Sequence, residues 1–507
     1  MSKSNLLALG CAGVMLFIVR ILVHVHFNSV FVDGDQTITW LSAVDKANGL
    51  WYTPYFYGQF YNISMEAILS APFIALGGKV QHVVPIVSNI IGVLPYFIGA
   101  FYLVRKQAVV PAIGLICLGI ILPAQYHFVT AMARGFSGGL AVFSFGFLLT
   151  GSKHSVIRII GFTCLFSSYL VNPNVLIIMV PLALLWFYNL ILIKQLRGIK
   201  TILPIVLGLV GTICVYFWIQ QFNNPMYSVH NLWKLHVSWD YFAKSIKSLD
   251  ARFLYLFPFL PKIGSLVLGT LVLILGYLIF KKNRTGVVVV GLTILFILST
   301  LALNKTMDGT DSTFFPYSRM YLALPFVLSL GYYLLLKEVK NKKRHVVVLV
   351  VIGLVGLVYQ FSDVPKKAIV SVRKNSGVVQ VLRINKLCVE CEKLKSLQQK
   401  FNADVMVFHS KTDEYLYGCK ALEPSISTLY PKYDRRYWTF AKHADTVYNT
   451  VLFLDWSLQL DEKMIEYTGT FKHLKNLPYP AYLLSNNTES IIDLYRNNNF
   501  ALRPYTE

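Results

Sequence analysis

The stretch FVDGDQTITW, residues 31–40, places two carboxylates two residues apart directly after an apolar run. A third acid, Glu66, follows within an aromatic-rich segment. Carboxylates can accept a proton during a group transfer, ligate a divalent cation or cap a helix. Because Asp33 and Asp35 precede a segment near 35–48 that we expect to be helical, capping is one interpretation of either acid. Their spacing also leaves Mg²⁺ or Mn²⁺ binding open, although nothing in the sequence makes a cofactor certain.

Two arginines stand at the edges of other apolar runs. Arg134 lies in MARGFSGG (132–139), and Arg319 ends the segment NKTMDGTDSTFFPYSR (304–319). A charge near hydrocarbon is costly unless it is paired or faces a wet cavity. One interpretation is that both side chains extend to lipid head groups. The other is a phosphate clamp, because the guanidinium fork matches a pair of anionic oxygens.

The composition places these side chains in a membrane protein. Of the 507 residues, 55% are hydrophobic and 14% are charged, whereas soluble domains carry about 25% charged residues. The formal net charge of +22 would suit a nucleic-acid-binding protein, but the lysines and arginines cluster between apolar runs. There they are typical of topology determinants and of contacts with anionic lipids. We therefore expect the lipid bilayer, and no nucleic acid, as a partner.

About eleven apolar runs are long enough to be transmembrane helices. They lie at roughly 6–27, 82–104, 108–127, 133–150, 156–171, 173–193, 201–222, 261–280, 285–303, 320–336 and 345–361. The first contains Arg20 and is followed by no clear cleavage pattern, so we expect an anchor rather than a signal peptide. The predicted fold class is mainly α: a polytopic membrane helix bundle over residues 1–361, with a large first outer loop at 28–81.

Basic residues fall in every second loop, which fixes the expected orientation. The basic loops are 105–106, 153–158, 194–200, 281–284 and 337–344, and the positive-inside rule makes them cytoplasmic. The loops 28–81, 128–132, 172, 223–260 and 304–319 then face outward, as does the tail, 362–507. The tail mixes short apolar runs, 403–410 and 450–456, with a helix-like segment at 387–401. This mixture predicts an extracytoplasmic α/β domain.

The pattern YxYGQxYxxxxEAxLxAPxxAL, residues 55–76, resembles the GT-C superfamily of integral membrane glycosyltransferases. More narrowly it is similar to a bacterial branch akin to protein mannosyltransferases and lipid A aminoarabinose transferases. The segments RGFSGG (134–139) and SRMYLALP (318–325) fit this branch, and YDRRYWTFAKH (433–443) is similar to a Tyr-Trp segment in outer domains of such proteins. The resemblance covers roughly 1–361 in layout. One departure is that the family usually has Asp followed by Glu after the first span, whereas Gln36 follows Asp35 here.

The resemblance implies a reaction and roles for the residues. A hexosyl- or pentosyltransferase of the inner cell membrane would move a sugar from a polyprenyl-phosphate donor to a glycolipid, glycan or protein acceptor on the outer face. Asp35, or Asp33, would be the catalytic carboxylate, which takes the proton of the acceptor hydroxyl as general base. The residues implied in substrate binding are Tyr57, Gln59, Tyr61, Glu66, Arg134 and Arg319. The tyrosines and Gln59 equally suit an interfacial aromatic belt, and Glu66 equally suits an anchor for its loop.

Other classes and the cysteines leave alternatives open. A transporter or flippase would explain many spans and charges, but we detect no pair of related halves. A polymerase or ligase of surface polysaccharide would share the lipid-linked donor. In the tail, Cys388 and Cys391 have the spacing of a redox motif without its strand–helix context. A structural disulfide among them and Cys419 is the other interpretation.

Overall fold

The computed structural model describes residues 3–59, 61–192, 199–222, 224, 226–227, 236–336, 342–374, 381–408, 416–430, 437–454, 472–474, 477 and 481–497. The chain divides into two compact units. Unit 1 comprises Met1–Asn28, Pro85–Trp218 and Trp233–Asn375, and unit 2 comprises Ser29–Val84, Ile219–Leu232 and Ser376–Glu507. Each unit is therefore assembled from segments that are far apart in the sequence.

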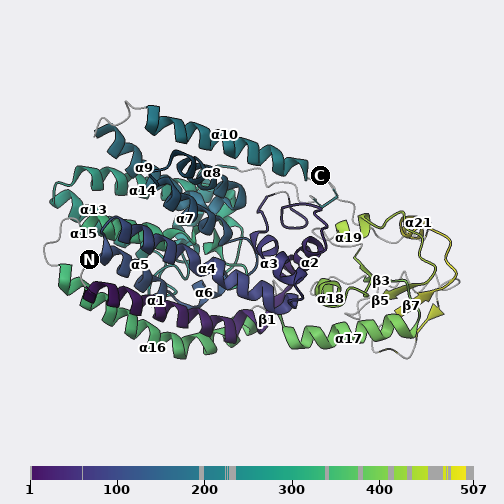
Figure 1. The fold of residues 1–507 in the computed structure, drawn as a ribbon. Helices are drawn as coiled ribbons and strands as arrows, with labels where there is room; N and C mark the ends of the chain where they lie inside the picture. The colour runs from purple at the N-terminus through teal and green to yellow at the C-terminus, as the bar shows by residue number, and fades with distance from the viewer. Residues whose placement is uncertain are drawn as a thin grey trace. The chain divides into compact units, whose positions relative to one another are not determined.

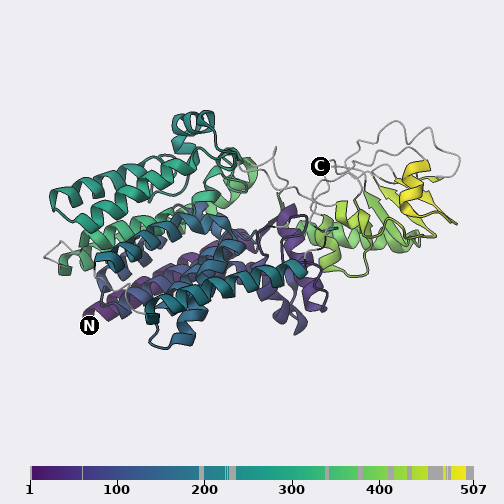
Figure 2. The same cartoon turned by 90° about the horizontal axis from the view of Figure 1, so that it is seen from above.

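Unit 1 is a bundle of apolar helices that lie side by side (Figures 1 and 2). Its helices are α1 (Lys3–Val23), α4 (Val80–Arg105), α5 (Val109–Ile121), α6 (Ala124–Ala131), α7 (Gly138–Thr150), α8 (Ser155–Val171), α9 (Leu176–Leu192), α10 (Ile199–Gln221), α11 (Trp239–Lys247), α12 (Leu249–Arg252), α13 (Leu266–Phe280), α14 (Arg284–Thr300), α15 (Leu324–Leu336) and α16 (Lys342–Lys374). The single-turn helices are η1 (His24–Asn28), η2 (Pro173–Val175), η4 (Asn304–Met307) and η5 (Tyr317–Tyr321). Helix α16 packs against both α1 and α5, and α15 packs against α5, α9 and α13.

The mainly α, membrane-spanning class expected from the sequence is confirmed. Within the described residues, four helices are long and apolar enough to cross a membrane, namely those in Lys3–Asn28, Val80–Arg105, Ile202–Gln221 and Arg344–Arg373. A bent pair, α5 with α6, is a fifth candidate. Seven shorter apolar helices accompany them. The chain is thus an integral, multi-pass membrane protein, and the count of eleven spans stays a prediction.

The continuous span expected at 108–127 is wrong, because the helix breaks there. Helices α5 and α6 meet at a bend of 94°. Between them, Leu122 has an extended backbone, with φ −65° and ψ 148°. Pro123 explains the break, since proline lacks an N–H and disfavours helical geometry in the residue before it. Helix α6 therefore runs across the direction of α5.

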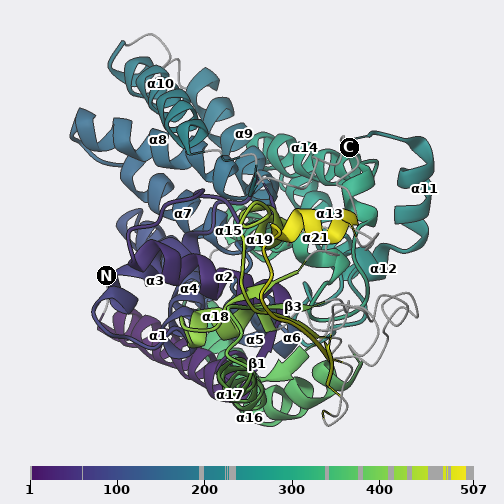
Figure 3. The same cartoon turned by 90° about the vertical axis from the view of Figure 1, so that its right-hand side faces the viewer.

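Unit 2 joins residues 29–84 to the tail (Figure 3). Strand β1 (Phe31–Asp33) pairs antiparallel with β2 (Val381–Arg383), so that Asp33 lies opposite Val381. Helix α2 (Gly34–Ala47) follows β1 directly and packs beside α3 (Met65–Ala75). The helix expected near 35–48 is thus confirmed, and a strand of the tail holds its start.

The tail contributes a five-stranded sheet in the order β4-β3-β5-β7-β6. The strands are β3 (Val405–Phe408), β4 (Thr428–Leu429), β5 (Val451–Leu454), β6 (Lys472–His473) and β7 (Ala481–Leu484). Strand β3 is parallel to β4 and β5, whereas β7 is antiparallel to β5 and β6. Side chains of β3 and β5 form a core with α19 (Tyr437–Ala441) and α21 (Ile491–Asn497). The α/β character predicted for the tail is confirmed, with both expected strands present and the expected helix found as α17 (Ile384–Lys400).

A disulfide braces the helices of unit 2. Cys391 on α17 is bonded to Cys419 on α18 (Tyr417–Leu422), and Cys388 is a free thiol. The next residue back, Gly418, packs on α2, where an added Cβ would lie 2.9 Å from Cγ2 of Thr37. The disulfide therefore holds α18 in position beneath the helix that carries Asp35.

Candidate active site

The two acids of FVDGDQTITW occupy different environments at the start of α2. Asp33 is fully buried, and its Oδ1 accepts a hydrogen bond from the Gln36 N–H at 2.9 Å. Its extended backbone, φ −118° and ψ 174°, is that of an N-cap. Asp35 lies in the first helical turn and is partly exposed. Asp33 thus caps α2, while Asp35 is the more accessible acid of this pair.

A metal site at these acids would be incomplete in the described residues. No group of three or more His, Cys, Asp and Glu side chains is placed there to share an ion. A Mg²⁺ or Mn²⁺ ion held by Asp33 and Asp35 would have to complete its coordination shell with water or substrate oxygens. The cation therefore stays a prediction.

The YFYGQFYNI segment folds back on itself. The Phe56 N–H donates to the Asn62 carbonyl at 3.0 Å, and Asn62 has a positive φ of 62°. Gly58 also has a positive φ, 84°, which disfavours other residues, and its N–H donates to the Tyr227 carbonyl at 2.7 Å. Gln59 is buried, and its Oε1 accepts from Asn62 at 3.4 Å. Tyr61 is partly exposed.

Tyr57 anchors this turn to a buried aromatic cluster, which we define as Tyr52, Tyr57, Tyr227 and Trp438. Tyr227 stacks on Tyr52 and Trp438 with ring centroids 4.9 Å apart in both pairs. Tyr57 meets Trp438 edge to face at 5.0 Å. The cluster thus joins residues 52–57, residues near 227 and the tail, all within unit 2. Because Tyr57 and Tyr227 are almost fully buried, the cluster is part of the packed core as well as a candidate binding surface.

Asp45 and Lys46 place charge beside this cluster. The Tyr57 hydroxyl donates to Asp45 Oδ2 at 2.9 Å, and Lys46 Nζ donates to Ser42 Oγ at 2.7 Å and to the Thr53 carbonyl at 3.1 Å. Burial raises the pKa of Asp45, against the opposing effects of Tyr57 and nearby lysines. Burial lowers the pKa of Lys46 to about 8. No sequence motif marks Asp45 and Lys46, and both pKa shifts follow from their burial in the fold.

Glu66 is buried in the first turn of α3, with 1% of its surface exposed. A carboxylate in a first turn is favoured by the positive end of the helix dipole. This setting is compatible with an anchor for the loop and with a substrate contact, so both interpretations stay predictions.

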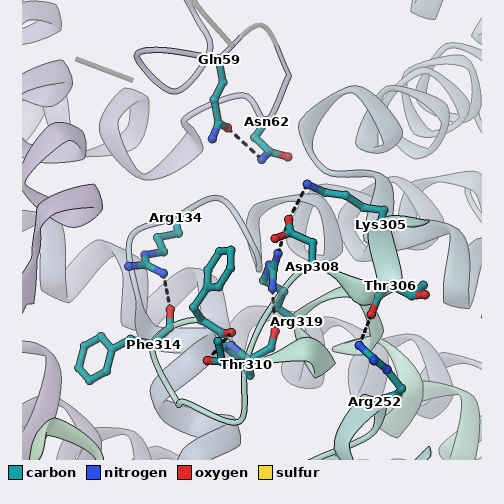
Figure 4. Close-up of polar contacts among 12 residues, drawn as sticks. Gln59, Asn62, Arg134, Arg252, Lys305, Thr306, Asp308, Thr310, Phe314 and Arg319 are labelled. Carbon is teal, nitrogen blue, oxygen red and sulfur yellow. Dashed lines mark hydrogen bonds and ion pairs between the residues drawn. The ribbon is translucent and has the colours of Figure 1, made fainter. Parts of the chain in front are cut away.

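In unit 1, Arg134 and Arg319 converge on one loop, which we call the arginine loop and define as residues 304–321 (Figure 4). Arg134 Nη1 donates to the Phe314 carbonyl. Arg319 Nη1 donates to the Pro316 carbonyl at 3.0 Å, and its Nη2 forms an ion pair with Asp308 Oδ2 at 2.8 Å. Both guanidinium groups are buried. Side chains from segments 185 residues apart therefore meet at the same loop.

Two further cationic side chains contact or lie in the arginine loop, and they were not recognised from the sequence. Arg252, at the end of α12, donates to the Thr306 carbonyl at 2.7 Å and lies 4.1 Å from the Tyr317 ring centroid. Lys305 forms an ion pair with Asp308 at 2.9 Å. The one signal for Arg252 in the sequence was its position in the loop 223–260, which is expected to face outward. Four cations thus contact this loop, which itself carries two carboxylates, Asp308 and Asp311.

A cavity of about 400 Å³ opens among α4, α5, α7, α9 and α15 of unit 1. Most of its lining is apolar, including Leu140 and Phe147 of α7 and Phe326 and Leu330 of α15. Helices α7 and α15 begin shortly after Arg134 and Arg319, respectively. Lys106 and Tyr102 line the cavity at the far end of α4. The cavity therefore extends along the helices that follow the two arginines.

The residues singled out in the sequence fall into two groups. Asp33, Asp35 and the Tyr57–Glu66 segment lie in unit 2, and the two arginines lie in unit 1. Within each group the structure brings the members together on neighbouring elements. Unit 2 thus holds the carboxylates, and unit 1 holds the guanidinium groups.

The whole fold resembles that of a known membrane enzyme. No family model and no curated protein matches the chain. Among solved structures it is similar to ArnT from Cupriavidus metallidurans in the apo state, with a TM-score of 0.52 and 11% identity over 93% of this chain and 97% of that chain. The same protein bound to undecaprenyl phosphate gives a TM-score of 0.49 and 12% identity over the same shares. ArnT is a lipid A aminoarabinose transferase of the GT-C superfamily. The expected GT-C-like fold is thereby confirmed.

Proposed function

We propose that this protein is a membrane glycosyltransferase that moves a sugar from a polyprenyl-phosphate donor to an acceptor on the outer face of the membrane. The observation that carries this proposal is the meeting of Arg134 and Arg319 at one loop of a GT-C-like bundle. The proposed sugar is a hexose or a pentose, and the proposed acceptor is a glycolipid, a glycan or a protein.

The charges at the arginine loop support an anionic leaving group. Arg319 and Lys305 both pair with Asp308, and Arg134 and Arg252 bring the cations to four, against the two carboxylates of the loop, Asp308 and Asp311. This excess of positive charge favours a phosphate, whose charge grows as the bond to the sugar breaks. Because Arg319 already bonds Asp308, a bound phosphate would take over part of that interaction.

The cavity beside α7 and α15 supports a donor with a lipid chain. Its volume, about 400 Å³, lies in the range of small-molecule sites. Its apolar lining suits a prenyl chain, while a phosphate attached to that chain would reach the arginines at the start of the same helices.

The acids of unit 2 would act on the acceptor. The acceptor oxygen attacks the anomeric carbon, the bond from that carbon to the phosphate oxygen breaks, and the electron pair leaves with polyprenyl phosphate. Asp35 accepts the proton of the acceptor hydroxyl as general base. A direct attack of this kind inverts the configuration at the anomeric carbon. Asp33 contributes by capping α2 and so fixing the position of Asp35.

Release of polyprenyl phosphate from a polyprenyl-phosphate sugar by the purified full-length protein tests the proposal. Loss of a hydrogen bond to a charged group costs about 1.5–3 kcal/mol, so Arg134→Ala and Arg319→Ala should each raise the donor KM about ten- to a hundredfold. Arg284→Ala is the matched control, because Arg284 is exposed at the start of α14. Equal kinetics for all three variants, or no release by the wild type with any donor sugar, would refute the proposal.

A further inference from the structure

The broken helix α5–α6 leaves backbone groups that must be satisfied inside the bundle. The carbonyls of Ile120 and Leu122 both accept from Gln360 Nε2 of α16, at 3.0 Å and 2.6 Å. The carbonyl of Ile121 accepts from the Phe259 N–H at 3.1 Å. Gln360 is fully buried. Since an unsatisfied carbonyl in hydrocarbon is costly, these donors fix where the chain bends.

The other end of α6 is held by a buried arginine. Arg20 of α1 has 4% of its surface exposed, and its Nη1 donates to the His127 carbonyl at 3.3 Å and to Thr130 Oγ1 at 3.1 Å. Its Nη2 donates to the Asn89 carbonyl at 3.4 Å. Asn28 completes the contact, since its Nδ2 donates to the Ala131 carbonyl at 3.3 Å.

Arg20 has no carboxylate partner among the described residues. Its charge faces the carbonyl end of α6 instead, where the helix dipole places partial negative charge. A buried arginine is expensive unless such groups compensate it. The arrangement is therefore a charged cap for a short helix within the membrane bundle.

The space for this cap depends on Gly92 of α4. A Cβ at Gly92 would lie 2.1 Å from Arg20 Nη2 and 2.3 Å from the Thr130 carbonyl oxygen. Any larger residue must push Arg20 and the end of α6 away, although it removes no polar group. The close approach of α4, α1 and α6 is thus built around a single glycine.

Arg134 follows α6 by three residues, and its N–H donates to the Met132 carbonyl at 2.9 Å. The end of α6 is thus three residues from the side chain that donates to Phe314 in the arginine loop. We propose that Arg20 is a positioning residue: it clamps the C-terminal end of α6 so that Arg134 is presented to the donor phosphate. The link to the donor rests on the function proposed above, whereas the clamp itself does not.

Hydrogen–deuterium exchange of the full-length protein in detergent tests the clamp without requiring activity. Arg20→Met and Gly92→Ala should both speed exchange in residues 124–136, with the rest of the bundle unchanged. Arg20→Lys, which retains the charge, should restore part of the protection. Gly269→Ala is the matched control, because an added Cβ at Gly269 meets no atom within 4 Å. Unchanged exchange in folded Arg20→Met and Gly92→Ala protein would overturn the clamp.

Kinetics with a polyprenyl-phosphate sugar test the link to Arg134. We expect Arg20→Met and Gly92→Ala to raise the donor KM about tenfold or more and to leave the acceptor KM unchanged, because only the phosphate contact is displaced. An effect of Arg20→Met without one of Gly92→Ala would mean that the Arg20 charge acts directly, and would overturn positioning. If the wild type turns over no donor, the proposed function fails, while the exchange experiment still decides the clamp.

Discussion

Asp33 and Asp35 have separate tasks although one residue lies between them. Asp33 is buried and bonded to the Gln36 N–H, so that its substitution acts first on helix α2. Asp35 is partly exposed and its side chain is not the cap. Asparagine retains the capping ability of aspartate and removes its basicity. The two acids can therefore be separated by the same conservative change.

We expect Asp35→Asn to lower turnover about 10²–10⁴-fold, as general-base removal does, with an unchanged Tm. Asp33→Asn should cost less turnover, whereas Asp33→Ala should lower the stability of the protein by about 0.5–2 kcal/mol through loss of the cap. Asp240→Asn is the matched control, since Asp240 is an exposed acid in the first turn of α11. A larger kinetic loss for Asp33→Asn than for Asp35→Asn would transfer the catalytic assignment to Asp33.

Lys46 supplies a prediction about pH. Burial lowers its pKa from 10.5 to about 8 in the folded protein. The unfolded chain then binds more protons between these values, so the contribution of Lys46 to stability is present at high pH and is lost as pH falls through 8. Relative to Lys46→Met, wild-type protein should gain about 1 kcal/mol in unfolding free energy between pH 7 and pH 9. Thermal melts of both proteins at several pH values measure the difference, and parallel profiles would contradict it.

At the residue scale, types and spacing identified the acids and two of the arginines because these sit in local motifs. Arg252 could not be found in this way, since its partner Thr306 lies 54 residues away and only the fold brings them together. The same is true of the contact of Trp438 with Tyr57. Contacts between distant segments carry no signature in a single sequence.

At the scale of elements, apolar runs with clear ends were predictable. Strands β3 and β5 are short apolar runs, and α17 shows helical periodicity, so each was expected. The break between α5 and α6 was not, although Pro123 is its local cause. A proline inside an apolar run signals a kink or a break equally, and the donors that stabilise the break come from α16 and from Phe259.

The disulfide between α17 and α18 yields a prediction at this scale. It closes a loop of 28 residues in sequence separation, for which chain entropy gives about 3–4 kcal/mol of stabilisation. Cys391→Ser and Cys419→Ser should each lower Tm. They should also loosen the packing of α18 against α2, and turnover that depends on Asp35 should fall as a result. Cys388→Ser is the matched control, because Cys388 is a free thiol.

Alkylation of unfolded, unreduced protein followed by mass spectrometry provides a direct check. Cys391 and Cys419 should stay unlabelled until a reductant is added, while Cys388 is labelled at once. Labelling of Cys391 or Cys419 before reduction would show that the bond is absent, and equal Tm values for all three serine variants would remove its structural role.

At the scale of the whole molecule, unit 2 combines residues 29–84, residues 219–232 and the tail from residue 376. Strand β1 lies in the first of these segments and β2 lies in the tail. Their pairing requires both segments to be on the same side of the membrane. The disulfide in this unit is typical of proteins in oxidising compartments. Both observations agree with the alternation of basic loops, which predicts that residues 28–81 and the tail face outward.

A topology reporter tests this orientation. A reporter active only in the cytoplasm should be silent when fused after Glu507, because the alternation of basic loops predicts that the tail lies outside. The same reporter fused after Lys282, in the loop between α13 and α14, should be active, because the basic residues near 281–284 hold that loop in the cytoplasm. The paired fusions also control for expression. Activity after Glu507 would place unit 2 in the cytoplasm, and Asp35 could then no longer act on an acceptor at the outer face.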